Sequence, residues 1–327
     1  MHIANLYRYP IKGLSPERID AVEIKANEGF PVDRQYALLR TDVSFDPAAP
    51  KWIAKANFIM LMLHEQLATL STHYDEHHKS LKIKQSDGSS RTFKLDESKG
   101  REALEAFFYE FMPQQLVSKP RLLEAKDHHF CDKAPKYISL INLASLRQLE
   151  QKWGEELDPL RFRANIYIDE AQPFSELEWL GKAIQLGSLS ARVMQPNGRC
   201  AATNVNPVTG VRDRNIPGKL RAAFGHKDLG VYLSVVEGGL LREGDSVVVD
   251  ASFDTPVQSV FTATNSGAET LICTACYYRF NPGLLNSSWH QVHDLPEDWR
   301  CRDCGATRDA VKLATMFLGG SFVARFI

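Results

Sequence analysis

The sequence predicts a mainly β protein with some α-helix, followed by a small metal-binding module. Short β-branched segments bounded by turn residues recur between about residues 160 and 250. Amphipathic helical patterns are few. Near the C-terminus, four cysteines form two C-x2-C pairs, a spacing typical of a metal site. The chain has 327 residues, which is more than a single hydrophobic core usually supports. The length therefore predicts two or three domains.

The composition is that of an ordinary globular protein, with 44% hydrophobic and 24% charged residues. The formal net charge of −1 provides no overall field that would attract nucleic acid or an anionic membrane. No apolar run approaches the ~20 residues that span a bilayer, and Arg8 and Pro10 interrupt what would be the core of a signal peptide. We therefore expect a cytoplasmic protein without nucleic-acid or membrane partners.

The first 120 residues predict strands and one helix. "AVEIKA" alternates apolar and polar residues, and "LKIKQSDGSSRTFKLD" places two strands around Asp87-Gly88, a hairpin signal. The preceding "STHYDEHH" contains three histidines, but we interpret it as a polar turn rather than a metal site. Apolar residues at i, i+3, i+4 and i+7 then predict an amphipathic helix that Pro113 ends: Leu104, Phe107, Phe108 and Phe111.

The next region predicts a second helix and then mostly strands. The helix begins near Leu143 and stops at Gly154. The strand-like segments "FRANIYID", "SARVMQ", "GVYLSVVEGG" and "DSVVVD" indicate a closed or strongly curved antiparallel barrel. Residues 251–270 are poor in large apolar side chains, and they predict a linker.

The four-cysteine module consists of Cys273 and Cys276, then Cys301 and Cys304 after 24 intervening residues. Disulfides are rare in a reducing cytosol, so these thiols are interpreted as metal ligands. Four thiolates form a tetrahedral cage that fits zinc or a single iron, and the spacing alone does not choose between them.

The residues around the second pair, "HDLPEDWRCRDCGA", resemble the second knuckle of rubredoxin. This resemblance implies an iron centre that carries one electron, packed against an aromatic cluster that includes Trp299. Tyr277 departs from the pattern, because rubredoxins usually have glycine after the second cysteine. Arg300 and Arg302 lie close to the predicted iron, and their charge predicts a raised reduction potential. Zinc remains a possible replacement for iron.

Cys200 stands apart from these cysteines in "QPNGRCAATNVNPVTGVRD". An isolated cysteine between strands is most often a buried small hydrophobe. Here a tight turn and Arg199 precede it, which would lower the thiol pKa and present the sulfur at a loop. Cys131 is interpreted as an ordinary thiol.

Several segments in order resemble the MOSC family, named after the C-terminal domain of molybdenum cofactor sulfurases. "RFRANIYID", "GRCAATNVNP" and "GVYLSVVEGGLLREGD" resemble its MOSC domain, whereas "YPIKGLSPERI" and "PVDRQYAL" resemble its N-terminal β-barrel domain. The resemblance implies that Cys200 binds molybdenum held by one pterin, and that Arg199, which precedes it, also binds the cofactor. It also implies that five residues bind the pterin and its phosphate: Lys12, Arg34, Arg163, Asn165 and Asp132. Near Asp132 the sequence departs from the family, because Ala134 replaces a polar residue.

The resemblances together predict four segments. They are a MOSC N-terminal β-barrel domain over residues 1–120, a MOSC domain over 121–255, a linker over 256–269, and a rubredoxin-like domain with a C-terminal tail over 270–327. The family implies reduction of N-hydroxylated or other N–O or S–O substrates. Electrons would come from a reductase through the iron centre. Two alternatives stay open: a sulfur carrier that uses a Cys200 persulfide, and a MOSC protein with a structural zinc ribbon.

Overall fold

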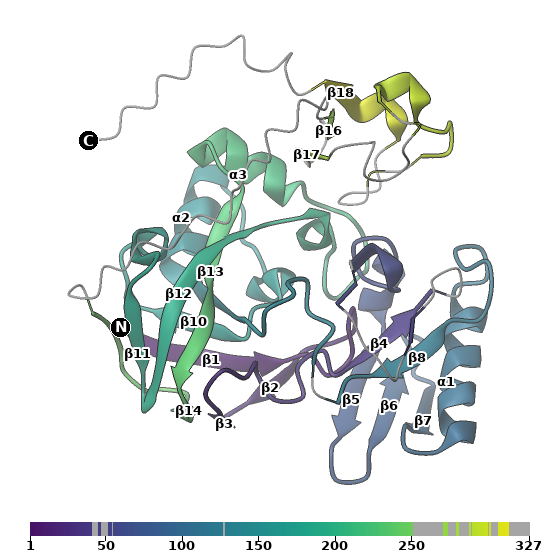
Figure 1. The fold of residues 1–327 in the computed structure, drawn as a ribbon, viewed down its shortest axis with the longest axis horizontal. Coiled ribbons are helices and arrows are strands. Elements are labelled where there is room, and N and C mark those ends of the chain that lie inside the picture. Colours follow the sequence, from purple (N-terminus) through teal and green to yellow (C-terminus); the bar gives the residue numbers. More distant parts are fainter. Residues whose placement is uncertain are drawn as a thin grey trace. The chain divides into compact units, whose positions relative to one another are not determined.

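The computed structural model describes residues 1–40, 45–46, 52–53, 55–126, 128–250, 271–273, 279–280, 288, 290–299, 301 and 307–313. The chain divides into two compact units, Met1–Val257 and Gln258–Ile327, each considered by itself below (Figure 1). The predicted linker and the C-terminal tail lie outside the described residues. Within the described ranges, no helix is long and apolar enough to cross a membrane.

A curved eight-stranded sheet forms the centre of the first unit (Figure 1). Backbone hydrogen bonds join its N-terminal strand β1 (His2–Arg8) to residues 245–247, at the start of its C-terminal strand β15 (Val247–Asp250). Ile3 N donates to Asp245 O at 2.9 Å, and Val247 N donates to Met1 O at 3.0 Å. The predicted mainly β architecture with few helices is confirmed. The strand order is β15 (Val247–Asp250), β11 (Ala183–Leu186), β12 (Leu189–Gly198), β13 (Asp228–Glu237), β9 (Ile138–Asn142), β10 (Ile166–Asp169), β1 (His2–Arg8) and β2 (Glu17–Ile19).

One strand pair contradicts the predicted antiparallel arrangement. β9 and β10 are parallel, with Leu140 opposite Ile166. Parallel neighbours need a crossover connection, and α2 (Leu143–Trp153) supplies it. The Asn142 side chain accepts from Ala144 N at 3.0 Å, and Gly154 ends the helix with φ 75°. The prediction for this helix is confirmed at both ends.

The start of the chain is built into the same sheet. β1 pairs antiparallel with β10, and β3 (Ala21–Ile24) pairs with β14 (Gly239–Arg242). Strands near the N-terminus therefore share sheets with strands more than one hundred residues further along. A loop that follows β1 is thereby held close to loops from the second half of the chain, and this closeness builds the site described below.

A smaller β region with its own core follows in sequence. It contains β4 (Tyr36–Leu39) paired with β8 (Arg121–Glu124), and a meander of β5 (Ser71–Asp75), β6 (Ser80–Lys84) and β7 (Ser90–Lys94) beside α1 (Ser98–Phe111). The predicted hairpin and amphipathic helix are confirmed. The polar-turn prediction for "STHYDEHH" is wrong for its first half, because Ser71–Asp75 is a strand. Tyr74 on that strand is only 3% exposed and pairs in register with Leu81.

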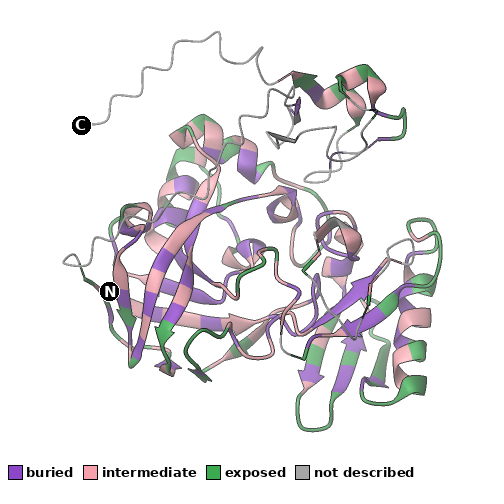
Figure 2. Cartoon of the chain, in the orientation of Figure 1, coloured by how far each residue is buried: buried purple, intermediate pink, exposed green. Residues whose placement is uncertain are grey.

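The two faces of the large sheet carry different cores. Figure 2 shows the buried residues along its strands. Adjacent strand residues point to opposite faces, so Leu140 packs inside the curve and Ile141 packs outside it. α2 and α3 (Ile216–Phe224) contribute to the outer core. Short 3-10 helices within the described ranges are η1 (Lys55–Asn57), η2 (Glu65–Thr69), η3 (Pro159–Phe162), η4 (Ser175–Trp179), η5 (Ala201–Asn204), η7 (Val292–Asp294) and η8 (Arg308–Ala310).

The second unit contains a small three-stranded sheet. Its order is β17 (Arg279–Phe280), β16 (Leu271–Cys273) and β18 (Val311–Leu313). One buried cluster includes Cys273, Trp299 and Cys301. The described residues thus place one cysteine from each C-x2-C pair in the same small core. Cys276, Cys304, Tyr277, Arg300 and Arg302 lie outside the described residues.

Candidate functional site

Cys200 lies in the loop directly after β12, immediately before η5. Its side chain is partly exposed. Its carbonyl oxygen accepts from Thr203 Oγ1 at 2.8 Å and from Thr203 N at 3.1 Å. These bonds hold the backbone of the loop and leave the thiol to other partners.

Arg199 is a buried cation that anchors this loop, with only 4% of the residue exposed. Its Nε donates to Leu229 O at 2.8 Å, its Nη1 donates to Phe162 O at 3.0 Å, and its Nη2 also donates to Leu229 O. Within the described part of the chain, no carboxylate forms an ion pair with it. Burial lowers the pKa of Arg199. The guanidinium therefore joins two backbone segments and keeps a positive charge next to Cys200.

Arg212 fixes the far end of the Cys200 loop. Its Nη1 donates to Ala201 O at 3.2 Å, and its Nη2 contacts Met62 O at 2.5 Å and Glu65 Oε2 at 3.2 Å. A Cβ at Gly210 would lie 2.8 Å from Thr69 Cγ2, and the glycine has φ +69°, so this turn requires glycine. The loop is therefore held against the smaller β region on one side and β13 on the other.

Asn206, in the segment "GRCAATNVNP" that contains Cys200, closes a turn and binds Asp213. Its Oδ1 accepts from Val208 N at 2.9 Å and from Thr209 N at 3.1 Å, closing a turn. Its Nδ2 donates to Asp213 Oδ2 at 3.0 Å, and Asp213 also binds the buried Arg161 at 2.8 Å. An aspartate at 206 would keep the turn but place two carboxylates together. Arg161 was not identified from the sequence, although it begins the "RFRAN" segment.

Lys12 and Asp132 are brought together, although 120 positions separate them. Lys12 is 6% exposed, and its Nζ donates to Asp132 Oδ1 at 2.6 Å and to Phe130 O at 2.8 Å. Lys55 approaches the other carboxylate oxygen at 3.7 Å. Burial would raise the pKa of Asp132, but Lys12 and Lys55 outweigh it and hold that pKa well below its usual value.

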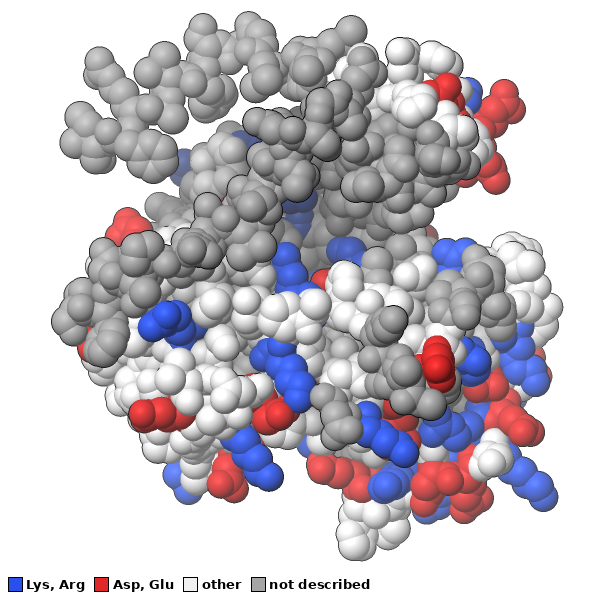
Figure 3. All heavy atoms as spheres, viewed as in Figure 1, with Lys and Arg blue, Asp and Glu red and all other residues white. Residues whose placement is uncertain are grey.

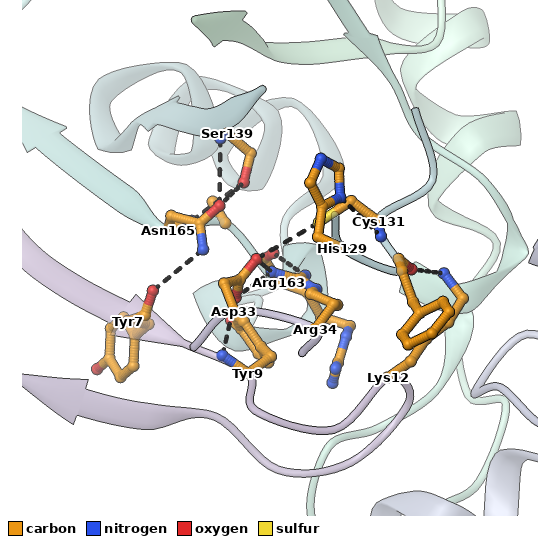
Figure 4. Close-up of polar contacts among 12 residues, drawn as sticks. Tyr7, Tyr9, Lys12, Asp33, Arg34, His129, Cys131, Ser139, Arg163 and Asn165 are labelled. Carbon is orange, nitrogen blue, oxygen red and sulfur yellow. Dashed lines mark hydrogen bonds and ion pairs between the residues drawn. The ribbon is translucent and has the colours of Figure 1, made fainter. Parts of the chain in front are cut away.

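Arg34 and Arg163 meet around Tyr9 (Figure 4). The guanidinium carbon of Arg34 lies 4.2 Å from the Tyr9 ring centroid, and that of Arg163 lies 4.3 Å from it. Arg34 Nη2 also donates to Arg163 O at 3.0 Å. Both arginines have left-handed backbones, with φ 50° and 52°. Such backbone strain is typical of sites where side-chain placement matters.

Asp33 holds only one of these two arginines. Arg34 Nη1 donates to its two oxygens at 2.7 and 2.6 Å, and Tyr9 N donates to Oδ1 at 2.9 Å. Arg163 Nη2 is instead buried without a hydrogen-bond partner among the described residues, as is the Tyr9 hydroxyl. Burial and the neighbouring Arg34 lower the pKa of Arg163 to about 10. A buried donor with unfilled capacity beside a second cation suits an anionic ligand.

Asn165 lies in the same region, but its polar atoms are engaged within the protein (Figure 4). It is 2% exposed. Its Oδ1 accepts from Ser139 Oγ at 2.8 Å and from Ser139 N at 3.2 Å, and its Nδ2 donates to Tyr7 O at 3.3 Å. These contacts join β9 to β1 and indicate a positioning role. Its direct contact with a cofactor stays a prediction.

Cys131 contributes more to this site than the sequence indicated. Its Sγ lies 3.7 Å from Asp33 Oδ2. Burial raises the pKa of this thiol, and the Asp33 charge raises it further. His129 Nδ1 accepts from Cys131 N at 3.1 Å, and burial lowers the pKa of His129 to about 4. Sequence reasoning did not select Tyr9 or Asp33. Both lie in segments that resemble the family, "YPIKGLSPERI" and "PVDRQYAL", and this position was the available signal for them.

No metal site is complete in the described residues, where no three His, Cys, Asp or Glu side chains are placed to hold one. In the second unit, this result covers two of the four predicted ligands, Cys273 and Cys301, because the other two lie outside the described residues. The fourfold thiolate set stays a prediction.

Two family matches cover most of the first unit. Residues 1–112 match the MOSC N-terminal beta barrel domain, and residues 125–248 match the MOSC domain. The chain is 28% identical over 144 residues to mitochondrial amidoxime-reducing component 1 of Danio rerio, covering 41% of this chain and 43% of that protein. It is 30% identical over 141 residues to mitochondrial amidoxime reducing component 2 of Homo sapiens, covering 39% and 42%. The matched segment thus spans less than half the length of these relatives.

Similarity extends to another group of proteins and to solved structures. The chain is 34% identical over 119 residues to molybdenum cofactor sulfurase of Drosophila persimilis, covering 34% of this chain and 14% of that protein. The YuaD protein of Bacillus subtilis shares 12% identity with a TM-score of 0.36, covering 76% of this chain and 93% of that one. The chain therefore contains a MOSC N-terminal beta barrel domain followed by a MOSC domain, homologous to amidoxime-reducing components and molybdenum cofactor sulfurases.

Proposed function

We propose that this protein is a molybdenum-cofactor-dependent oxidoreductase that reduces N-hydroxylated compounds or other N–O or S–O bonds. The MOSC domain supports association with the cofactor, and homology to amidoxime-reducing components supports the reaction class. The observation that carries the proposal is the pair of arginines at Tyr9, where Arg163 keeps a buried donor without a partner. An anionic cofactor would accept a hydrogen bond from that donor.

The residues present fit such a group. Arg34 and Arg163 would bind its phosphate, because guanidinium groups match phosphate oxygens in a two-pronged way. Lys12 would add a positive charge, with Asp132 fixing the position of its ammonium group. Asn165 would hold the backbone around the site. When bound, the cofactor supplies a metal centre that accepts two electrons and transfers an oxygen atom.

Cys200 would provide the thiolate ligand to molybdenum, a soft donor suited to it. Arg199 would offset the negative charge of that thiolate and hold its loop between β13 and η3. The overall reaction for an N-hydroxylated compound consumes two electrons and two protons, breaks the N–O bond, and releases the N–H compound and water. The chain's contribution is to hold the cofactor and to position Cys200.

The second unit would deliver the electrons one at a time from a reductase. Cys273, Cys276, Cys301 and Cys304 would bind one iron. The common core of Cys273, Cys301 and Trp299 supports this assignment, because it brings together one cysteine of each pair.

Metal and activity measurements on the full chain test the proposal. We expect molybdenum and iron in the purified protein, a visible iron-thiolate absorption that bleaches on reduction, and reduction of an amidoxime to the amidine. Cys200→Ser should lose molybdenum and turnover and keep the iron-thiolate absorption. Full turnover by that variant would refute the ligand assignment.

A matched variant separates the two centres. Cys304→Ser should lose the iron-thiolate absorption and turnover with a reductase, but keep turnover with a small artificial reductant. Stoichiometric zinc without iron, in protein from a host grown without zinc contamination, would eliminate the relay and favour a structural ribbon.

A second candidate is sulfur carriage by a Cys200 persulfide, which the similarity to molybdenum cofactor sulfurases favours. It predicts cyanide-releasable sulfur that disappears in Cys200→Ser, together with no N–O reduction. An electron relay in the second unit would have no purpose in that reaction.

A further inference from the structure

One buried carboxylate, Glu176, has no place in the predicted cofactor set. Figure 3 shows Lys, Arg, Asp and Glu side chains at the surface of one face, whereas Glu176 on η4 is 0% exposed. Burying a charge costs free energy unless hydrogen bonds or an opposite charge compensate for it. The groups that bind this carboxylate therefore indicate what it does.

The Glu176 carboxylate accepts hydrogen bonds from three elements. Its Oε2 accepts from Asn142 Nδ2 at 3.0 Å, at the end of β9, and from Ser145 Oγ at 2.8 Å on α2. Its Oε1 accepts from Gly230 N at 3.3 Å on β13. Burial raises the pKa of Glu176, and these hydrogen bonds oppose the effect. The carboxylate therefore links the start of the crossover helix to a central strand of the large sheet.

The peptide group between Leu229 and Gly230 lies at an irregularity of β13. The register with β12 passes from Val231 directly to Asp228, and the register with β9 begins at Val231. Leu229 and Gly230 are therefore aligned with no residue of these two described strands. Gly230 has φ +79°, and a Cβ there would overlap Leu140 O, so this position requires glycine. Irregularities of this kind are frequent beside functional sites, where they redirect a side chain.

Two side chains hold opposite sides of this peptide group. Arg199 Nε donates to Leu229 O at 2.8 Å, and Gly230 N donates to Glu176 Oε1 at 3.3 Å. The C=O and N–H groups of a trans peptide point in opposite directions, and no peptide bond between described residues is cis. The cation and the carboxylate thus hold the peptide group from its two sides, in place of the bonds that a regular strand would supply.

Glu176 and Arg199 also share an unusual electrostatic position. Buried charged side chains usually pair with an opposite charge. In the described part of the chain, other buried charged residues do so: Lys12 with Asp132, Asp33 with Arg34, and Arg161 with Asp213. Glu176 and Arg199 form no ion pair among the described residues, and they meet instead at the same peptide group.

We propose that Glu176 is a positioning residue for Cys200. It holds the N–H side of the Leu229–Gly230 peptide group, and the carbonyl side of that group anchors the Arg199 guanidinium. Arg199 immediately precedes Cys200, so the loop takes its place from this anchor. This inference rests on the proposed function, in which Cys200 binds molybdenum. Glu176 would act through Arg199 and not by contact with the cofactor.

Hydrogen exchange of individual backbone amides in the full chain tests this inference, and it needs neither bound molybdenum nor turnover. In the wild type, the Gly230 amide should exchange at least about tenfold more slowly than an unprotected amide, because Glu176 accepts from it in a buried place. Exchange of this amide at the unprotected rate would overturn the inference in the wild type itself, with no variant needed.

Glu176→Gln removes the contact to Gly230 with little change in side-chain size. Glutamine has one acceptor oxygen where glutamate has two. That oxygen should remain with Asn142 and Ser145, because Oε2 has two contacts and both are shorter than the one at Oε1. The glutamine NH2 group then faces Gly230 N, and two donors oppose each other.

We expect Glu176→Gln to speed exchange about tenfold at the Gly230 amide and at two amides of the Cys200 loop. The loss of one hydrogen bond to a charged group shifts a local equilibrium by about this factor. The loop amides are those of Arg199 and Thr203, which donate to backbone oxygens within and beside the loop. Rates relative to the amides of β6 remove any general loss of stability. Unchanged rates at Arg199 and Thr203 would overturn the inference.

Ser145→Ala is the matched control, because it removes a different donor from the same carboxylate. Ser145 Oγ also accepts from Phe174 N at 2.7 Å, so the Phe174 amide should exchange faster. The amides of Arg199 and Thr203 should keep their wild-type rates relative to β6. Faster loop exchange in both variants would reduce Glu176 to a general structural role and contradict positioning.

A double variant tests whether Glu176 acts through Arg199. In an Arg199→Met background, the peptide group no longer holds a guanidinium. Adding Glu176→Gln should then change the Thr203 exchange rate by less than about twofold, since changes that act through one contact are not additive. A further increase of about tenfold would show that Glu176 acts on the loop independently of Arg199, and it would overturn the inference.

Molybdenum retention links the result to the cofactor. With Cys200 as the ligand, Glu176→Gln should retain about tenfold less molybdenum after dialysis than Ser145→Ala, because residues that position a metal ligand affect metal affinity by about this factor. Equal retention in the two variants would overturn the inference. A wild-type chain without molybdenum would instead refute the proposed function, and the exchange rates would still decide whether Glu176 positions the Cys200 loop.

Discussion

Arg199 and Arg163 are both arginines that the family resemblance assigns to the cofactor, yet their surroundings differ. All three nitrogen atoms of the Arg199 guanidinium donate to backbone carbonyl oxygens. Arg163 lies over the Tyr9 ring and leaves Nη2 buried without a partner among the described residues. The first satisfies its hydrogen bonds within the fold, whereas the second requires something else to satisfy them.

This difference separates two roles that sequence motifs do not distinguish. A cation whose donors are already used contributes position and charge. A cation with an unused buried donor is available to a ligand, because leaving such a group unpaired costs about 1–3 kcal/mol. Replacing the first kind of cation should therefore lower stability, and replacing the second should weaken cofactor binding.

Replacement of Arg199 should have the largest effect on stability. Arg199→Met leaves the Leu229 and Phe162 carbonyl groups without their donor, so the free energy of unfolding should fall by about 3 kcal/mol. Urea unfolding monitored by fluorescence measures this change. Arg18→Met is the matched control, because Arg18 forms an exposed ion pair with Glu243 and its replacement should lower stability far less than that of Arg199. Equal losses of unfolding free energy in Arg199→Met and Arg18→Met would contradict a special structural role for Arg199.

Replacement of Arg163 should affect the cofactor rather than the fold. Arg163→Met removes a buried charge that lacks a carboxylate partner in the described part of the chain. The unfolding free energy of the cofactor-free protein should therefore change by less than about 1 kcal/mol. Cofactor retention should fall by about 10- to 100-fold. Pterin released from the purified protein is the readout, and a stability loss as large as that of Arg199→Met would contradict it.

A smaller effect is expected in the turn that holds the Cys200 loop. Asn206→Asp places a carboxylate where Asn206 Nδ2 now lies 3.0 Å from Asp213 Oδ2, which should cost about 1 kcal/mol of stability at neutral pH. In an Asp213→Asn background this cost should disappear, because the opposing carboxylate is gone. A double-mutant cycle measures the coupling. The same cost in both backgrounds would disprove the explanation for Asn206.

The smallest effect on stability is expected for Asp132, which pairs with Lys12. Its pKa is lowered in the folded protein, so the stability it contributes is present above its unfolded pKa of about 3.9 and is lost as pH falls. Asp132→Asn should therefore be less stable than the wild type at pH 7, by less than about 1 kcal/mol because the carboxylate is 45% exposed. The difference should narrow below about pH 4. A gap that widens in acid would reverse the sign.

Local elements were predictable from the sequence, and non-local pairings were not. The β6–β7 hairpin and helices α1 and α2 depend on turn residues and periodicity within a short window. The parallel β9–β10 pair was missed because "ISLIN" was not identified as a strand, although strand, helix and strand in succession indicate such a crossover. The pairing of β1 with β10 joins positions that no local pattern connects.

In the candidate site, too, local features were predictable from the sequence and non-local contacts were not. Lys12, Asp132, Arg34 and Arg163 were selected because each lies in a segment that resembles the family, and the fold brings Lys12 beside Asp132 and Arg34 beside Arg163. The motifs did not reveal which donors remain available, since that depends on backbone carbonyls from distant strands. Tyr9, Asp33 and Arg161 were not selected, although they lie in the quoted segments "YPIKGLSPERI", "PVDRQYAL" and "RFRANIYID". Their roles depend on contacts with residues that the fold brings beside them.

The most direct test of this account is the molybdenum and pterin bound to the full chain, purified alike for the wild type and Arg163→Met from a host that makes the cofactor. The account predicts about one molybdenum per wild-type chain, and at least about tenfold less in a variant that unfolds at the same urea concentration. Background molybdenum in the wild type, or an undiminished content in Arg163→Met, would contradict it.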